Sequence, residues 1–517
     1  MLSLRPRAWL ALAAVLLLGL ALRWPVASLP LERDEGGYAY IAQRWLQGEA
    51  PYRESFDQKP PGIYAAYAAI ERALGESPTA IHWGTQLWCL LTVAMVFLLG
   101  RRLFGEEAGF AAGALAAFMT VDHGLLANAA NTELFMIAPL AAAFLAALLA
   151  AERESWLWAL ACGACTGLAL LFKQVALTNA VFYALLLARS KRRIPLLGAF
   201  LAGAALLVAP MALYLKAAGV WPAFYDCVIG YNLAYGGATA LPDYFKNFGL
   251  ALGRTLPSLW PVYLFALFGL FQAAAPAVRL VLAWLAFSFL GSCAGGYFRV
   301  HYLLQAAPPL AVLAGFGIAQ ACEKLKLPGR RALALLVVLQ GVLSGLWYYL
   351  PGPELAKSRR LYGANPFPEA VAAAKLIAER TSSQDRVFIF GSEPEILYYA
   401  RRKSAERYIY VYPLFVDAPD TAARQAEALA QVRAADPKMV VTVFVRTSFL
   451  ASVRAPLDII NGVKDLLRGY HLLAVMPAQR GNIGAMVMGE DAQRMWKRSP
   501  MWYDRRIWGF LAVWEKN

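Results

Sequence analysis

Charged residues are scarce in this chain of 517 residues. Asp, Glu, Lys and Arg make up 16% of the sequence, whereas soluble globular proteins average about 25%. Hydrophobic residues make up 59%. So much apolar sequence predicts a protein whose solvent is a lipid bilayer rather than a larger water-soluble core. The formal charge is +15, but much of it lies in short loops between apolar runs, which favours a role in topology and in contact with anionic lipids over binding of nucleic acid.

Cysteine and histidine are also too few to suggest redox or zinc chemistry. Most of the six cysteines lie inside apolar runs, and we predict no disulfide framework. Cys162 and Cys165 form a C-x-x-C within ALACGACTGLALL, where small residues that pack one helix against another are favoured over a redox or metal motif. The four histidines, at 82, 123, 301 and 471, form no spaced ligand cluster, so a high-affinity zinc site has little support.

Long apolar segments are abundant, and we count eleven of them. Several lie at the short end of the roughly 17–25 residues that a crossing helix needs. The first follows a basic start like that of a signal peptide, but no small-residue cleavage site comes after it, so we expect a retained helix. The segments are 8–25, 80–100, 108–126, 132–150, 156–172, 175–189, 194–215, 256–274, 279–296, 303–321 and 332–350.

Basic clusters predict the orientation of these spans. They occur at Arg5 with Arg7, Arg101 with Arg102, 189–193 and 324–331, and eleven spans bring all four to the same side. The positive-inside rule makes that side cytoplasmic. The opposite face then carries 26–79, 127–131, 216–255, 297–302 and everything after about 351.

Composition changes after Pro351. Short apolar runs at 387–391, 439–445 and 471–477 indicate buried strands, and 367–380, 418–434 and 457–468 indicate helices between them. We therefore expect a mainly α polytopic helical bundle (1–350) followed by a small extracytoplasmic α/β domain (351–517) that lacks a G-x-G-x-x-G motif and a P-loop. The aromatic and basic tail from 495 to 517 is expected to lie either in the membrane interface or within the domain.

The first outer loop carries the most informative charges. Asp34 and Glu35 precede Gly36 and Gly37, so the backbone there is expected to approach a ligand closely. The following segment YAYIAQRWL has helical apolar spacing and is predicted to lie flat on the membrane. In DQKPPG, two prolines stiffen the chain after Lys59. The alternatives are a solvated loop or helix cap for the two acids and a headgroup anchor for the lysine.

Five motifs in order resemble the GT-C glycosyltransferases that use polyprenyl-phosphate sugars, including the protein O-mannosyltransferases and the aminoarabinose transferase of lipid A. The motifs are RDEGGYAYIAQ, DQKPPG, NTELF, GLALLFKQ and YFRVHYLLQAAPP. The resemblance covers about residues 30–310. It departs at Gln58, where the aminoarabinose enzyme has an acid directly before the lysine, and this puts a role for Asp57 in doubt.

The resemblance implies a catalytic role for Asp34, which would activate the acceptor as a base. Cations would stabilise the departing lipid phosphate. Lys59, Arg299 and His301 fit that role, and Lys173 fits it alongside the alternative of interfacial snorkelling.

The second catalytic acid that the resemblance implies is Glu133, which would assist the base or help to hold a divalent metal, with Asn131 and Glu35 as possible support. Asn131 or Thr132 capping the next helix is the alternative, with Glu133 in its first turn. No cofactor is certain, and a divalent metal stays open. Tyr231, Tyr235 and Asp243 in the aromatic loop 216–255 are further candidates for shaping the acceptor or sugar pocket, although no motif assigns them.

The sequence thus predicts a hexosyl- or pentosyltransferase of the bacterial inner membrane that works by a single inverting displacement. Its expected partners are a polyprenyl-phosphate sugar donor, an envelope acceptor (lipid, polysaccharide or protein) and membrane lipids. One alternative is a transporter or flippase of lipid-linked sugars, but transporters favour inverted repeats and ionisable residues near mid-membrane. A non-catalytic assembly protein that binds a partner through its outer domain is the other alternative.

Overall fold

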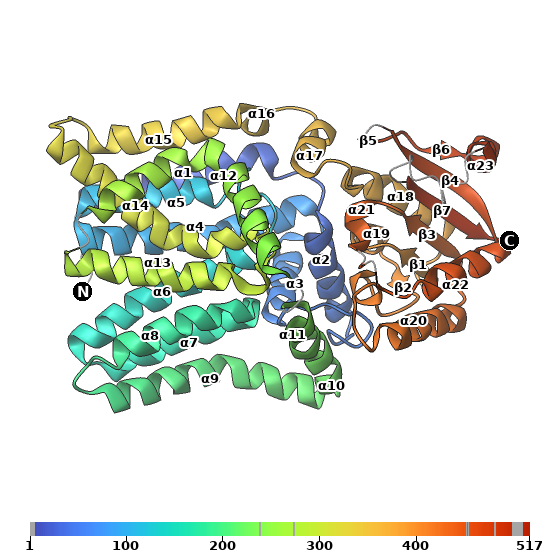
Figure 1. Ribbon diagram of the computed structural model, residues 1–517, viewed down its shortest axis with the longest axis horizontal. Coiled ribbons are helices and arrows are strands. Elements are labelled where there is room, and N and C mark those ends of the chain that lie inside the picture. Colours follow the sequence, from blue (N-terminus) through green and yellow to red (C-terminus); the bar gives the residue numbers. More distant parts are fainter. Residues whose placement is uncertain are drawn as a thin grey trace.

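The computed structural model consists of a bundle of long helices with a seven-stranded sheet at one end (Figure 1). It describes residues 6–236, 239–271, 274–450, 452, 454–479, 482–498 and 510–517. Four features expected from sequence fall at least partly outside these ranges: Arg5, part of the aromatic loop 216–255, part of the apolar segment 256–274, and 499–509 of the aromatic tail.

Each of the eleven apolar segments corresponds to helix. Six helical stretches in the described part of the chain are long and apolar enough to cross a membrane: Pro6–Val26, Pro78–Phe104, Thr132–Arg153, Arg193–Ala217, Leu241–Leu270 and Val300–Lys324. Shorter apolar helices add to the bundle, and they include α7 (Trp156–Phe172), α8 (Leu177–Leu187) and α13 (Pro276–Ser292). The bundle also contains α1 (Pro6–Arg23), α4 (Pro78–Phe104), α5 (Glu106–Met119), α6 (Thr132–Arg153), α9 (Arg193–Ala217), α12 (Leu241–Leu270), α14 (Ala307–Lys324) and α15 (Arg330–Ser344).

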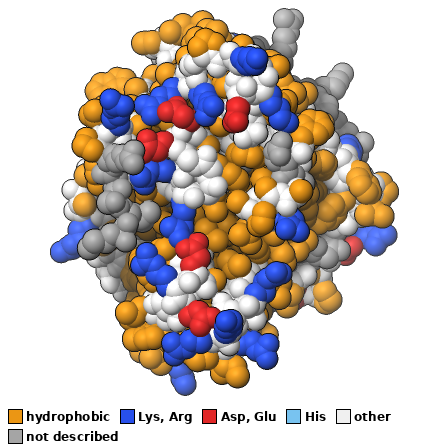
Figure 2. All heavy atoms as spheres, turned by 90° about the vertical axis from the view of Figure 1, so that its left-hand side faces the viewer, with side chains coloured by type: hydrophobic (Ala, Val, Ile, Leu, Met, Phe, Trp, Pro, Cys, Tyr) orange, Lys and Arg blue, Asp and Glu red, His pale blue; other side chains and the backbone are white. Residues whose placement is uncertain are grey.

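The basic loops gather at the end of the bundle that lies away from the sheet. Ion pairs join Arg102 at the end of α4 to Glu152 at the end of α6, and Arg331 at the start of α15 to Glu107 at the start of α5. Figure 2 shows Lys and Arg side chains among hydrophobic ones on this end. The sheet therefore lies opposite the basic loops, which is the arrangement that the charge pattern predicts.

Glycines let the helices α7 and α9 approach closely in the region of the C-x-x-C motif. A Cβ at Gly163 would lie 1.9 Å from the carbonyl oxygen of Phe200, and one at Gly203 would lie 2.1 Å from that of Leu160. Cys162 and Cys165 are both free thiols on α7. The interpretation of this segment as a small-residue packing surface is confirmed.

Arg23, at the end of α1, fixes the loop that leads to α6. Its side chain is fully buried, and its guanidinium donates hydrogen bonds to Gln86 Oε1 and to the carbonyl oxygens of Thr120, Ala127 and Asn128, at 2.7–3.1 Å. A buried guanidinium needs such partners because an unsatisfied buried charge is costly. The loop before Glu133 is thereby held against α1.

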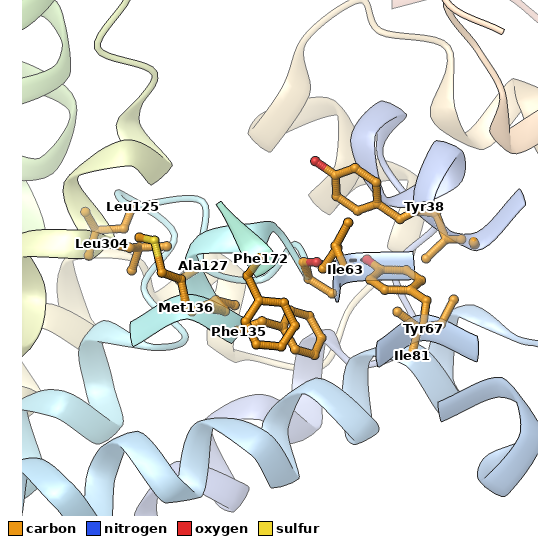
Figure 3. Packing of buried hydrophobic residues seen from close by; sticks show 14 of the residues in the cluster. Tyr38, Ile63, Tyr67, Ile81, Leu125, Ala127, Phe135, Met136, Phe172 and Leu304 are labelled. Carbon is orange, nitrogen blue, oxygen red and sulfur yellow. Dashed lines mark hydrogen bonds between the residues drawn. The ribbon is translucent and has the colours of Figure 1, made fainter. Parts of the chain in front are cut away.

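Two short helices lie between the bundle and the sheet, α2 (Arg33–Leu46) and α3 (Gly62–Leu74) (Figure 1). The aromatic side chains of Tyr38 on α2 and Tyr67 on α3 pack edge to face, and Tyr67 contacts Phe135 of α6 (Figure 3). Residues 35–44 of α2 are all buried. The prediction that this segment lies flat on the membrane is therefore wrong, because the region after 351 covers its second face.

The sheet has the strand order β2-β1-β3-β7-β4-β5, with β6 paired to β4. Its strands are β1 (Arg386–Phe390), β2 (Lys403–Ser404), β3 (Met439–Val443), β4 (Tyr470–Gln479), β5 (Asn482–Ile483), β6 (Val487–Met488) and β7 (Phe510–Lys516). β1 is parallel to β2 and β3, whereas β7 is antiparallel to both of its neighbours. The helices include α17 (Glu354–Tyr362), α18 (Phe367–Arg380), α19 (Glu395–Ala400), α20 (Thr421–Ala435), α21 (Arg446–Phe449) and α22 (Asp458–Leu466).

The strands and helices expected after Pro351 are present, and the described end of the tail adds a strand that sequence reasoning did not predict. Residues 510–516 form β7 between β3 and β4, with Phe510 to Val513 fully buried. Trp514 packs edge to face on Trp496 at a ring distance of 5.0 Å. This part of the tail thus belongs to the sheet rather than to the membrane interface.

Deleting residues 510–517 should unfold the sheet region, because β3 and β4 lose their shared partner and buried apolar side chains lose their contacts. Limited proteolysis of the detergent-solubilised protein should show rapid cleavage after about residue 351, with the helical bundle spared. Deleting Asn517 alone is the control. Equal protease resistance of the two variants would contradict a structural role for β7.

Candidate active site

The candidate site lies where α2 meets the ends of the long helices. At the start of α2, Glu32 and Glu35 form a capping box: Glu35 Oε2 accepts from the backbone N–H of Glu32 at 3.0 Å, and the side chain of Glu32 accepts from the backbone N–H of Glu35. This cap sets the first turn of the helix, in which Asp34 is the second residue.

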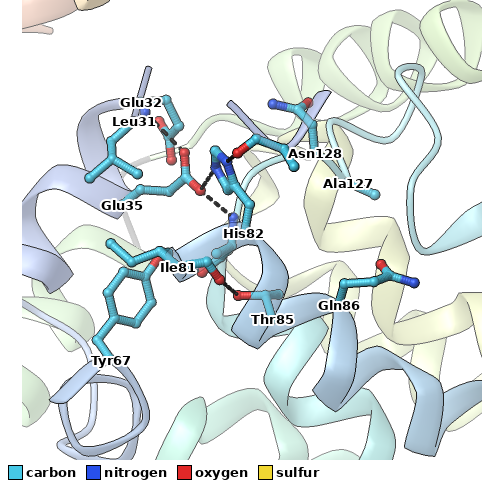
Figure 4. Close-up of polar contacts among 12 residues, drawn as sticks. Leu31, Glu32, Glu35, Tyr67, Ile81, His82, Thr85, Gln86, Ala127 and Asn128 are labelled. Carbon is cyan, nitrogen blue, oxygen red and sulfur yellow. Dashed lines mark hydrogen bonds and ion pairs between the residues drawn. The ribbon is translucent and has the colours of Figure 1, made fainter. Parts of the chain in front are cut away.

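Asp34 and Glu35 are adjacent in sequence but have different environments. The Asp34 side chain is 30% exposed, and its Oδ2 lies 3.9 Å from Lys59 Nζ. Glu35 is fully buried: its Oε1 accepts from the backbone N–H of Ala130 at 2.6 Å and lies 2.9 Å from His82 Nε2 (Figure 4). Of the acid pair, only Asp34 can reach a substrate, and Glu35 joins α2 to the bundle.

Both ring nitrogens of His82 have partners inside the protein. Nδ1 lies 2.8 Å from the carbonyl oxygen of Ala27, and Nε2 lies 2.9 Å from Glu35 Oε1. Because both side chains are buried and engaged with protein atoms, the pair suits an anchor rather than a reactive group.

Gly36 and Gly37 are approached by protein rather than by a ligand. A Cβ at Gly36 would lie 2.4 Å from the Cβ of Glu395 and 2.7 Å from its backbone nitrogen, and one at Gly37 would lie 1.7 Å from the hydroxyl oxygen of Tyr410. The expectation of a ligand at this backbone is therefore wrong. The two glycines instead allow the region after 351 to pack on α2.

Lys59 lies in the rigid loop before α3, close to two carboxyl groups. Burial lowers its pKa, but Asp34 and Asp57 raise it, and the net pKa is above the ordinary value. The ammonium therefore stays charged at neutral pH. Its backbone carbonyl accepts a hydrogen bond of 2.7 Å from the hydroxyl of Tyr52, which holds the loop in place.

Asp57 shapes this loop from inside the protein. Its side chain is 4% exposed, its Oδ1 accepts from the backbone N–H of Gln58, and its Oδ2 accepts from the hydroxyl of Tyr64, at 2.6 and 2.9 Å. Burial raises the pKa of Asp57 to about 6, against an opposing effect of Lys59. Asp57 thus supports Lys59.

Two cavities meet at Lys59. The first, which we call the lysine cavity, has a volume of about 290 Å³. It is lined by Lys59, Lys173, Glu133, Tyr302 and Gln305, and by apolar side chains that include the exposed Ile229 and Leu233. The second, which we call the arginine cavity, has a volume of about 450 Å³ and lies between the bundle and the region after 351. It shares Gln58, Lys59 and Tyr302 with the first.

The arginine cavity brings together most of the residues predicted from sequence. Its lining includes Asp34, Lys59, Asn131, Arg299 and His301. Glu133 and Lys173 line the lysine cavity instead, where they form an ion pair. Glu35 lines neither. The charged side chains expected to meet one phosphate are thus divided between two connected spaces, and only Lys59 touches both.

Glu133 is closely engaged with its neighbours at the start of α6. It accepts from Lys173 Nζ and, at 2.9 Å, from the hydroxyl of Thr132. Lys173 Nζ also lies 3.9 Å from the centre of the Tyr302 ring. The side chain of Asn131 makes no cap hydrogen bond, and its buried Oδ1 has no partner among the described residues. The capping alternative therefore does not describe Asn131, which faces the arginine cavity.

A metal finds no suitable donor set in the part of the chain that the structure describes. It contains no group of three or more His, Cys, Asp or Glu side chains arranged around a common point. Asp34 and Glu133 are each compensated by a lysine. This arrangement suits a carboxylate–ammonium site.

Sequence reasoning missed several residues of the arginine cavity. Arg254 of α12 lies on its wall and donates to the carbonyl oxygen of Leu361, while Tyr412 and Asn365 come from the region after 351. Tyr302 stands inside the quoted motif YFRVHY, and its position beside Arg299 and His301 could have identified it. No sequence signal points to Tyr412. Of the aromatic-loop candidates, Tyr231 lines the cavity, Asp243 does not, and the side chain of Tyr235 lies outside the described residues.

Comparisons with known proteins agree on the fold. Residues 58–214 match the family model described as dolichyl-phosphate-mannose-protein mannosyltransferase. No curated protein sequence matches the chain.

Among solved structures, ArnT from Cupriavidus metallidurans bound to undecaprenyl phosphate is similar, with a TM-score of 0.62 and 17% identity over 86% of this chain and 94% of that one. The same protein in the apo state has a TM-score of 0.60 and 15% identity over 98% of this chain and 97% of that one. The apo oligosaccharyltransferase of Archaeoglobus fulgidus has a TM-score of 0.56 and 15% identity over 93% of this chain and 74% of that one. The chain therefore has the GT-C fold of these membrane glycosyltransferases.

Replacing Asp57 by Asn should make the free energy of unfolding less dependent on pH than in the wild type. Because the folded state favours the protonated carboxyl, it binds more protons than the unfolded state between about pH 4 and pH 6, so this group lowers the free energy of unfolding by up to about 3 kcal/mol as pH rises through that range. Thermal unfolding in detergent at pH 4.5 and pH 7 measures the difference. A wild-type and variant pair that respond equally to pH would contradict the raised pKa.

Proposed function

We propose that this chain is a glycosyltransferase that moves a hexosyl or pentosyl group from a polyprenyl-phosphate carrier to an envelope acceptor, with inversion at the anomeric carbon. The observation that carries the proposal is the pairing of a partly exposed carboxylate with a partly buried ammonium, Asp34 with Lys59, where the two cavities meet. The GT-C fold supports it.

In the proposed reaction, Asp34 accepts the proton of an acceptor hydroxyl or amine, and the acceptor atom bonds to the anomeric carbon. The bond from that carbon to the phosphate oxygen breaks, and the electron pair leaves with the polyprenyl phosphate. Lys59 meets the charge that develops on the phosphate, because its raised pKa keeps it cationic and its loop holds it in place.

The two cavities suggest separate places for the two substrates. The apolar side chains of the lysine cavity suit an isoprenoid tail, and Lys59 with Lys173 suits its phosphate. The arginine cavity, which contains Asp34 and lies against the region after 351, suits the acceptor. Arg299 and His301 then act on this side, between the acceptor and the leaving phosphate.

The proposal includes the location. The sheet end of the protein would face the non-cytoplasmic side of a bacterial inner membrane, with the N-terminus in the cytoplasm and residues 351–517 outside. The gathering of basic side chains on the opposite end supports this orientation. Both the donor and its leaving group would then remain anchored in the outer leaflet beside the site.

Asp34→Asn should abolish transfer, because the amide cannot take the proton. Membranes that contain the protein are mixed with a radiolabelled polyprenyl-phosphate sugar, and label in envelope acceptors is counted. Asp385→Asn is the matched control, because Asp385 lies in the loop before β1, lines neither cavity and accepts a hydrogen bond from the backbone N–H of Ser382. The rate should fall by a factor of at least about 100 for Asp34→Asn only. Equal labelling by both variants would refute the base assignment, and absence of labelling by the wild type would refute the proposed function.

Lys59→Met should lower turnover more than it lowers the amount of folded protein. The variant keeps most of the side-chain volume and removes the charge that meets the phosphate, so transfer should fall by roughly 100-fold. The radiolabel assay gives turnover, and fluorescence size-exclusion chromatography gives the amount of folded protein. A proportional loss of both quantities would assign Lys59 a structural role instead.

A further inference from the structure

The geometry around the first turn of α2 points to a role for the region after 351 in the reaction itself. Asp34 makes no side-chain hydrogen bond among the described residues, and its nearest charged partner is Lys59 at 3.9 Å. Its position is therefore set by the helix that carries it. The groups that fix the residues on either side of Asp34 decide where its carboxylate points.

Arg33 fixes the first side, through contacts with the loop that follows β1. Its Nε donates to the carbonyl oxygen of Ser392 at 2.5 Å, and its Nη2 donates to Glu393 Oε1 at 2.6 Å and to Asn365 Oδ1 at 3.2 Å. Its guanidinium also lies over the rings of Phe367 and Tyr412, at 5.5 and 6.0 Å. Every one of these partners comes from residues beyond 351, and the Arg33 side chain is only 9% exposed.

Glu393 is itself held rigidly. It is fully buried, and its second carboxylate oxygen, Oε2, accepts from the hydroxyl of Ser448 at 2.7 Å. The same hydroxyl accepts from the backbone N–H of Ser392 at 2.8 Å. Because both oxygens are engaged, Glu393 offers Arg33 one defined geometry.

Glu35 fixes the other side of Asp34 by its contacts with His82 and Ala130 of the bundle. The first turn of α2 is therefore held by contacts on two sides. Gly36 and Gly37 permit the close packing, since a side chain at either position would collide with Glu395 or Tyr410. In the run R-D-E-G-G, the first and third residues anchor the helix, the second carries the exposed carboxylate, and the two glycines make the close contact.

We propose that Glu393 is a positioning residue for Asp34: through Arg33 it sets the direction of the carboxylate into the arginine cavity. The inference rests on the proposed function. It gives the region after 351 a part in the transfer step, although Glu393 touches neither substrate. Because small misplacements of a reacting group are costly, loss of this contact slows the reaction more than it weakens donor binding.

The test compares Glu393→Gln with Glu369→Gln in the radiolabel assay, with donor concentration varied. Glu369, on α18, is the control, since it forms a partly buried ion pair with Arg359 on α17, and no hydrogen bond or ion pair joins the Glu369 side chain to α2 among the described residues. We expect the apparent kcat of Glu393→Gln, measured per folded protein, to fall by roughly 10- to 100-fold, with its donor KM changed by less than about 3-fold. Glu393→Asp, which restores the charge, should recover part of the rate.

A second variant guards against misfolding. Arg33→Gln combined with Glu393→Gln removes both charges, so no unpaired charge is left inside the protein, and the double variant should fold yet remain slow. A double variant as fast as the wild type would overturn the proposal. The proposal would also be overturned if the Glu369→Gln control accumulated as folded protein while the Glu393→Gln variant and the double variant did not. Arg33 and Glu393 would then serve folding only. If the wild type transfers label and Asp34→Asn does not, while Glu393→Gln equals its control, only this inference fails and the proposed function stands.

Discussion

The placement of one helical turn governs the rest of the site. The first turn of α2 is tied to the bundle by the pair of Glu35 with His82 and to the sheet region by the pair of Arg33 with Glu393. Both pairs are buried, and removal of one partner of a buried pair typically costs about 3–5 kcal/mol. Asp34 lies between Arg33 and Glu35. Because these two neighbours make the contacts that hold the helix, the Asp34 carboxylate stays available to a substrate.

Charge around the cavities follows a consistent pattern. Lys59 faces Asp34, Lys173 faces Glu133, and Arg33 faces Glu393, so each of these three acids has a cation of its own. Arg254 and Arg299 also line the arginine cavity, and neither forms an ion pair with a described carboxylate. The arginine cavity therefore contains uncompensated positive charge, which favours the entry of molecules that carry anionic groups.

Much of the bundle could be predicted because long apolar segments have few alternatives in a bilayer. The bounds of α18 also agree with the expected 367–380, since its apolar spacing is regular. The positions of Asp34 and Lys59 followed from motif order. The predictions that were wrong depend on contacts between residues distant in sequence. α2 was expected on the membrane surface, because no local sequence signal shows that Glu395 and Tyr410 pack against it. β7 was missed because its apolar core is short and lies in a tail rich in Trp, Lys and Arg.

The location of β7 has a consequence for the first turn of α2. This strand completes the sheet by entering between β3 and β4, and the loop after β1 in the same sheet holds Arg33. The site beside α2 therefore depends on a strand more than 450 residues away in sequence, since β7 borders β3, β3 borders β1, and the loop after β1 holds Arg33.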